Sequence, residues 1–260
     1  MRALLLLPLL VAVLLPAEDL AVAADGLTLT GRLFLPATAA AAPRPAVLVV
    51  HEWWGRNAYA DRRAAELAER GYAALSVDLY GEAASDDFPT AQRRSAPFYA
   101  DPGQFVRRLA PFAAALRRKP DVDGQRLAAI GFCFGGSAVL QWARSGAELR
   151  GVVAFHPGLA TAQPATRAPL ARILVCHGGA DPFVPPSQVA DFIAEMTAAK
   201  ADWRMDIHGQ AVHAFTNPEA GRGVTNVPAG VPFARAVAHH PAAEAASIDA
   251  MQRFLDDCLR

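Results

Sequence analysis

The sequence has few cysteines and no excess of charge of either sign. Three cysteines occur in 260 residues, and 25 Lys and Arg balance 25 Asp and Glu. An odd number of cysteines, without a Cys-x-x-Cys pair or a short Cys/His spacing, argues against a disulfide framework and against a structural zinc site. A chain without a basic excess has no electrostatic footprint for phosphates. We therefore expect no nucleic-acid partner and no metal.

Compositional extremes are also missing. Glycine and proline number 19 and 20, and aromatic residues make up 8%, which excludes fibrous and low-complexity proteins. With 53% hydrophobic and 19% charged residues the chain is too apolar to be disordered. No internal repeat or long linker divides it. A chain of this length can bury roughly 75% of its unfolded surface, so we expect one domain over residues 24–260, as a monomer.

Long hydrophobic runs are absent except at the N-terminus. Arg2 precedes an apolar run from Ala3 to Leu15, and an Ala-x-Ala site ends at Ala23. This is the order of a signal peptide, and the run is shorter than the about 20 residues that span a bilayer. We expect a signal peptide within residues 1–23 that is removed by cleavage after Ala23 or Ala17, giving an exported protein without a membrane span.

Two alternatives to the signal peptide remain open: the translation start is assigned too far upstream, or the segment is a genuine first strand. In either case the protein would be cytoplasmic. Glu18 to Ala23 has the character of such a strand. Cleavage after Ala17 would spare this strand, whereas cleavage after Ala23 would remove it.

Short apolar runs alternate with helical periodicity along the rest of the chain. Leu27 to Leu35 alternates behind an Asp25-Gly26 turn, which predicts an edge hairpin, and the continuous run from Ala46 to His51 predicts a strand buried on both faces. Residues 81–101 are polar, contain proline and carry no predicted element. We expect further strands at 73–77, 126–130, 151–155, 172–177 and 203–208, and helices at 58–70, 102–118, 137–144, 186–199 and 241–259. This order predicts an α/β fold, a mostly parallel sheet flanked by helices on both faces.

The strongest local signal is the segment from Gly131 to Gly136, GFCFGG, between a predicted strand and a predicted helix. A nucleophile on such a turn is strained, so small residues are needed two positions to either side. Cys133 occupies the nucleophile position, and the backbone N–H of Phe134 points toward an oxyanion. The alternative is a buried cysteine in an ordinary glycine-rich turn.

An acid and a histidine follow in the order that a nucleophile elbow requires. Asp181 follows one predicted strand and His213 follows a later one, so the order is nucleophile, acid, base. Asp181 before Pro182 also suits a plain turn. The other histidines have structural explanations: His156 lies in a loop, His177 and His208 end strands, and His239 and His240 begin a helix.

Five motifs together resemble the dienelactone hydrolase family, a branch of the α/β-hydrolases with a cysteine nucleophile. They are HEWWG from His51, DLYG from Asp78, GFCFGG from Gly131, HGGADPFVPP from His177 and HAF from His213. The resemblance covers residues 26–259. It implies hydrolysis of small carboxylic esters or lactones by a Cys133-Asp181-His213 triad, without metal or cofactor.

The resemblance also assigns roles next to the triad. Glu52 matches a glutamate that hydrogen-bonds the resting thiol and governs its activation, and the backbone N–H of Trp53 completes the oxyanion hole with that of Phe134. In the residue-based argument, His213 takes the thiol proton, the thiolate attacks the carbonyl, and a thioester forms and is hydrolysed. A thiol suits lactones and enol esters because their leaving groups are already stable.

This chain departs from the family at the substrate-binding positions. Ala214 replaces the serine that helps degradative dienelactone hydrolases bind a substrate carboxylate. Arg93, Arg94 and Tyr99 are candidates for the rest of that carboxylate site, with a solvated surface role as the alternative. Trp54, with Trp53, suggests an apolar pocket wall, though paired tryptophans also fill cores.

Three other functions remain open at this point. A cysteine acyltransferase or thioesterase would keep the triad and deliver the acyl group elsewhere, which product analysis would reveal. A noncatalytic small-ligand-binding protein on the same scaffold would be favoured by a lost triad member, and none is lost. A redox thiol protein would need a resolving cysteine, for which Cys176 is the candidate.

Overall fold

The computed structural model describes residues 16–38 and 42–260, so residues 1–15 of the expected leader (1–23) lie outside the described residues, whereas its residues 17–23 belong to a strand. The strands are β1 (Ala17–Ala24), β2 (Leu27–Phe34), β3 (Arg44–Val50), β4 (Ala73–Val77), β5 (Val122–Phe132), β6 (Gly151–Phe155), β7 (Arg172–Gly178) and β8 (Trp203–His208). The helices are α1 (Ala58–Glu69), α2 (Phe88–Ala100), α3 (Gly103–Arg117), α4 (Phe134–Arg144), α5 (Pro186–Ala198), α6 (Phe233–Ala236) and α7 (Pro241–Leu259). No helix within the described ranges is long and apolar enough to cross a membrane.

The strands form one mostly parallel sheet in the order β1-β2-β4-β3-β5-β6-β7-β8. Strands β3 to β8 pair in parallel, and β1 and β2 add an antiparallel edge. The expected edge hairpin is confirmed, because Ala24 pairs with Leu27 and the two residues between them, Asp25 and Gly26, have positive φ angles of 47° and 74°. Positive φ at both positions is the geometry of a tight hairpin turn.

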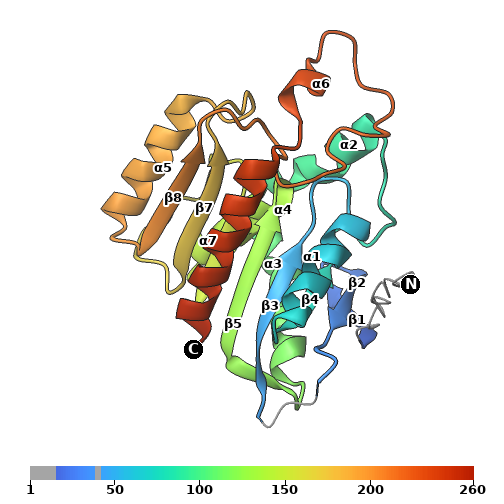
Figure 1. Ribbon diagram of the computed structural model, residues 1–260, viewed down its shortest axis with the longest axis vertical. Coiled ribbons are helices and arrows are strands. Elements are labelled where there is room, and N and C mark those ends of the chain that lie inside the picture. The colour runs from blue at the N-terminus through green and yellow to red at the C-terminus, as the bar shows by residue number, and fades with distance from the viewer. Residues whose placement is uncertain (1–15, 39–41) are drawn as a thin grey trace, which may run out of the picture.

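Helices cover both faces of the sheet, as the sequence predicts (Figure 1). Helices α1 and α7 pack on one face, and α3, α4 and α5 contribute to the core on the other. The central strand β3 is buried on both sides, with Val47 to Val50 fully inaccessible, which explains its continuous apolar run. Helix α1 begins where the Asn57 side chain accepts hydrogen bonds from Tyr59 N and Ala60 N.

The sequence analysis misses helix α2, which occupies most of the polar stretch assigned no element. The Asp87 side chain caps the helix by accepting a hydrogen bond from Thr90 N at 2.9 Å, and Pro89 lies in its first turn. Its buried side chains recur at helical spacing and are Phe88, Ala91, Ser95 and Phe98. The short helix α6 is missed as well.

The carboxyl ends of the parallel strands meet at one edge of the sheet. Glu52 follows β3, Cys133 follows β5, His156 follows β6, and Asp181 follows β7. Helices α2 and α6 lie at this edge (Figure 1). Ligands of open α/β sheets bind at the carboxyl ends of the strands, so this edge is where a site is expected.

Candidate active site

Cys133 lies on a strained turn between β5 and α4. Its φ of 54° and ψ of −115° are outside the regions that residues with a Cβ ordinarily adopt. A Cβ on Gly131 would approach Gly135 O to 2.0 Å, and one on Gly135 would approach Val50 O to 2.3 Å. The glycines on either side of the cysteine are therefore sterically required, as the interpretation of GFCFGG as a nucleophile elbow demands.

His213 and Asp181 are directly hydrogen-bonded. His213 Nδ1 lies 2.7 Å from Asp181 Oδ2, and both side chains are almost fully buried. The carboxylate accepts the Nδ1 proton, which leaves Nε2 as the nitrogen that can exchange a proton with a nucleophile. The loop after β8 is held here because His213 N donates to Ala236 O at 3.0 Å. The acid and base predicted from sequence order are thus brought together.

The surroundings of His213 favour its charged form. Burial by itself lowers the pKa of this imidazole, but the Cys133 sulfur and the Asp181 carboxylate outweigh burial and raise the pKa well above 6.5. Hydrogen bonds to both partners contribute to the rise. An imidazolium beside a sulfur is the arrangement that stabilises a thiolate, the nucleophilic form of cysteine.

Glu52 is in the site, but its hydrogen-bond partner differs from the expected one. Asn217 Nδ2 donates to Glu52 Oε2 at 2.8 Å, and no hydrogen bond from the Cys133 thiol to Glu52 is found among the described residues. Burial raises the pKa of the Glu52 carboxyl, opposed in part by Asn217 and by the charge of His213. The expected Glu52–thiol hydrogen bond is therefore absent from the described residues, and the side-chain hydrogen bond that Glu52 accepts there comes from Asn217.

Two backbone N–H groups are free to receive an oxyanion. Those of Trp53 and Phe134 donate to no acceptor in the described part of the chain, and Phe134 begins helix α4. The peptide that carries the Trp53 N–H is held through its carbonyl, Glu52 O, which accepts from Gly55 N at 3.2 Å, and the Tyr80 hydroxyl donates to Trp53 O of the next peptide at 3.1 Å. The His51 ring stacks on Phe134, with 5.7 Å between the ring centroids. These neighbours support both groups at the positions predicted for an oxyanion hole.

A cavity of about 600 Å³ opens over Cys133, His213 and Glu52. Its wall is mostly apolar and includes the aromatic residues Trp53, Trp54, Phe88, Tyr99, Phe183 and Phe233. No lysine or arginine is among the described residues that line it. A cavity of this kind accommodates a small apolar ligand, and its described wall offers no arginine or lysine to a ligand carboxylate.

The predicted substrate-binding residues divide into two groups. Trp54 and Tyr99 line the cavity, and Tyr99 approaches Cys133 and Ser137 while 46% of its surface stays exposed. Arg93 and Arg94 do not line the cavity. Arg93 is exposed, and its Nη2 donates to Thr90 Oγ1 at 3.3 Å. The Arg94 side chain is only 16% exposed; it pairs with Glu82 and its Nη1 donates to Ala83 O at 2.8 Å, so neither arginine is placed to bind a ligand in the cavity.

The other cysteines have surroundings that differ from those of Cys133. All three thiols are free, and Cys176 in β7 is completely buried. Burial raises the pKa of the Cys176 thiol to about 12, which keeps it protonated and unreactive. This environment weakens the interpretation as a redox protein with Cys176 as the resolving thiol.

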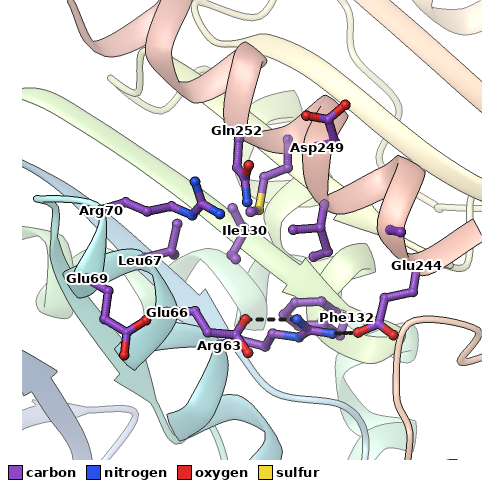
Figure 2. A pocket seen from close by; sticks show the side chains of 13 residues that line it. Arg63, Glu66, Leu67, Glu69, Arg70, Ile130, Phe132, Glu244, Asp249 and Gln252 are labelled. Atoms are coloured by element: carbon purple, nitrogen blue, oxygen red, sulfur yellow. Dashed lines mark hydrogen bonds and ion pairs between the residues drawn. The ribbon is translucent and has the colours of Figure 1, made fainter. Parts of the chain in front are cut away.

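A second cavity, of about 440 Å³, lies between α1 and α7 against β5 (Figure 2). Its floor contains Ile130 and Phe132, and its rim carries charged residues of both signs. Figure 2 shows Arg63 between Glu66 and Glu244, with which it forms ion pairs. None of the candidate triad residues lines this cavity, so it is separate from the chemistry proposed below.

Sequence reasoning overlooked the residues that surround His213. Thr216 and Asn217 are buried, and the ring of His156 packs against that of His213 with centroids 5.3 Å apart. The sequence did contain a signal for these residues. Thr216 and Asn217 are a polar pair directly after the HAF motif, and polar residues next to a catalytic histidine are candidates for positioning it.

Comparisons with known proteins show the family to which the chain belongs. The profile of the dienelactone hydrolase family matches residues 29–258. A carboxymethylenebutenolidase from Pseudomonas putida is 26% identical over 73% of this chain and 83% of its own length. A Bradyrhizobium protein named a probable 2-oxo-3-(5-oxofuran-2-ylidene)propanoate lactonase is 30% identical over 66% of this chain and 73% of its own.

A solved structure gives the same result over nearly the whole chain. It is a dienelactone hydrolase-like promiscuous phosphotriesterase from metagenomic libraries, with 33% identity and a TM-score of 0.84 over 95% of this chain and 99% of that one. The sheet order, the elbow and the family match point to one assignment. The chain belongs to the dienelactone hydrolase family, has its α/β-hydrolase fold, and is a carboxylic ester hydrolase.

Proposed function

We propose that the protein hydrolyses neutral carboxylic esters or lactones through Cys133, His213 and Asp181. The observation that carries the proposal is the 2.7 Å bond between His213 Nδ1 and Asp181 Oδ2, beside a cysteine on a strained elbow. The raised pKa of His213 supports an imidazole that can hold the proton of the attacking thiol.

The first half of the reaction forms a thioester. The thiol proton resides on His213 Nε2, and the Cys133 sulfur attacks the carbonyl carbon, whose π electrons move to oxygen. The Trp53 and Phe134 N–H groups bind this oxyanion, and donors of this kind are typically worth about 10²- to 10³-fold each. The carbonyl re-forms, the C–O bond breaks, and the alkoxide or enolate leaves, taking its proton from His213.

The second half returns the enzyme to its resting state. His213 takes a proton from water, and the hydroxide attacks the thioester carbonyl, forming a second oxyanion in the same hole. The C–S bond then breaks, releasing the carboxylic acid and the Cys133 thiolate, while His213 holds the proton. Asp181 stabilises the imidazolium throughout by accepting the Nδ1 proton.

The cavity supports the restriction to neutral substrates. The charged groups of its lining are Glu52 and His213, and the described wall offers no arginine or lysine. A substrate carboxylate placed there would lose its hydration and find no arginine or lysine as a partner, because the one cationic group of the described wall, His213, is already paired with Asp181. Uncharged enol lactones and short aryl esters meet no such penalty.

Activity measurements with active-site variants test the proposal. A panel of lactones, enol lactones and p-nitrophenyl esters is assayed with the wild type, Cys133→Ala and Asp181→Asn. Cys133→Ala should abolish turnover, and Asp181→Asn should lower kcat by about 10³- to 10⁴-fold, as loss of the orienting carboxylate does in serine triads. Unchanged turnover by Cys133→Ala would reject the nucleophile assignment. Transfer to an added alcohol in excess of hydrolysis would favour an acyltransferase.

A second candidate activity is the hydrolysis of uncharged phosphotriesters. It is favoured by the 33% identity to a promiscuous phosphotriesterase, together with a cavity whose described wall has no arginine or lysine. In this reaction the Cys133 sulfur would attack phosphorus and displace an aryloxide, and water would then displace the sulfur. Paraoxon in place of the ester tests it: nitrophenolate release that Cys133→Ala abolishes supports the activity, and release unaffected by the variant rejects it.

A further inference from the structure

Thr216 is a fully buried residue three positions after His213. Its hydroxyl oxygen lies 2.8 Å from His156 Nε2 and 2.8 Å from the Tyr59 hydroxyl. Its carbonyl accepts hydrogen bonds from Arg63 Nη2 at 2.8 Å and from Tyr59 at 3.1 Å. The hydroxyl and the backbone carbonyl of Thr216 therefore both form hydrogen bonds with side chains from distant parts of the chain.

His156 connects Thr216 to the candidate base. Its ring meets the His213 ring at 65°, with 5.3 Å between centroids, and its φ of 39° is a strained value for a residue with a Cβ. The peptide is fixed by a 2.8 Å bond from His156 N to Cys176 O in β7. Burial, followed by the charge of His213, lowers the pKa of His156 well below 6.5, so it packs against His213 as a neutral ring.

Helix α1 supplies the rigid support behind Thr216. Tyr59 and Arg63 lie one turn apart on its buried face, and the helix is fixed at its start by the Asn57 cap. Arg63 is also held by Glu66 and by Glu244 of α7, in the arrangement drawn in Figure 2. The support therefore connects two helices on one face of the sheet to the loop that carries His213.

We propose that Thr216 is a positioning residue whose hydroxyl holds His156 against His213 and thereby fixes the imidazole between Cys133 and Asp181. This inference rests on the proposed function. Thr216 and His156 do not line the cavity over Cys133, so neither contacts a substrate there. Loss of the hydroxyl should therefore affect the proton-transfer geometry and leave substrate binding intact.

The matched pair Thr216→Val and Thr216→Ser separates the hydroxyl from the shape of the side chain. Valine keeps the volume and removes the oxygen, whereas serine keeps the oxygen. We expect Thr216→Val to lower kcat by about 10-fold, less than the roughly 10²-fold that a 1 Å misplacement costs, with KM within about twofold of wild type. Thr216→Ser should retain wild-type kcat.

A second readout does not depend on ester hydrolysis. The rate at which iodoacetamide alkylates Cys133 reports the thiolate that His213 stabilises. The titratable groups facing His213 are Cys133, Asp181, Glu52, His156 and His177. In Thr216→Val we expect the alkylation rate near pH 6 to fall several-fold relative to the rate at pH 9, while Thr216→Ser follows the wild-type profile.

A third variant keeps the proposal falsifiable if Thr216→Val does not fold. His156→Phe retains a ring against His213 and removes the bond to Thr216, so it should reproduce the kcat and alkylation defects, and the double variant should be no worse than either single one. Additive effects, or alkylation and kcat profiles equal to wild type in folded single variants, would overturn the proposal. An enzyme without esterase activity whose alkylation profile still shifts would reject the proposed function and keep this inference.

Discussion

Asn217 Nδ2 donates a hydrogen bond to Glu52 Oε2 across 2.8 Å, and both side chains are almost completely buried. One amide bond only partly compensates a buried carboxylate, which is why burial dominates and the pKa of Glu52 is raised from 4.5. The ionised form of this glutamate therefore costs the folded protein stability.

We predict that Glu52→Gln stabilises the protein at neutral and alkaline pH. Below pH 4.5 the wild-type carboxyl is protonated in both the folded and the unfolded state, so the variants should not differ. The advantage of glutamine should grow as the pH rises from 4.5 through the higher folded pKa, and then level off. Urea unfolding at several pH values from 4 to 8 measures it, with Glu69→Gln on the exposed face of α1 as control. An equal advantage at all pH values would contradict the buried-acid interpretation.

The fold was largely predictable because most strands are buried on both faces. Runs such as Val47 to Val50 have no polar positions to obscure them. Helix α2 was not recognised because Pro89, Pro97 and two arginines interrupt its apolar pattern, and its buried positions include the polar Ser95. Asp87 before a proline in the first turn was the signal for its start.

The same missed helix explains the wrong substrate-binding residues. Gln92 and Tyr99 are separated by two turns of α2 and both line the cavity, whereas Arg93 and Arg94 lie on other faces of the helix. Without knowing that these residues form a helix, we could not predict which of their side chains face the cavity. The Glu52–Asn217 bond was unpredictable for a different reason, since it joins positions 165 apart in the chain and no local pattern encodes it.

Because the described cavity wall has no lysine or arginine, one charge added at its rim should change substrate preference. Gln92 lines the cavity from α2 and is exposed. Gln92→Arg should lower KM for an anionic enol lactone by about 3- to 5-fold, the effect of up to about 1 kcal/mol expected for an exposed ion pair. Gln92→Glu, the matched control, should raise that KM. Neither variant should change KM for an uncharged aryl ester, and a parallel change for both substrates would show that charge is not the cause.

The elbow glycines predict a sharp steric limit. A methyl group on Gly135 would lie 2.3 Å from Val50 O and 2.6 Å from His51 O, so the strand or the elbow must move. Gly135→Ala should destabilise the fold by about 3 kcal/mol, at the upper end of typical overpacking costs, and remove activity. Gly209→Ala has no atom within 4 Å of the new methyl and serves as the control. Thermal unfolding and iodoacetamide labelling of Cys133 measure both effects, and a stable Gly135→Ala with normal labelling would refute this account of the elbow.

Strand β1 constrains where an N-terminal leader can be removed, if the protein is exported as we propose. All eight residues from Ala17 to Ala24 pair with β2, and Val22 is buried with only 8% of its surface exposed. A chain beginning at Glu18 should match the full-length stability. A chain beginning at Ala24 loses the burial of Val22, worth about 1.5 to 3 kcal/mol, and leaves β2 as an unpaired edge prone to aggregation. Thermal unfolding of the two truncations and N-terminal sequencing of secreted material test this.

Equal stability of the two truncated chains, or a fully stable mature protein that begins at Ala24, would show that β1 contributes little to stability. An intact Met1 in the purified protein would reject export with cleavage.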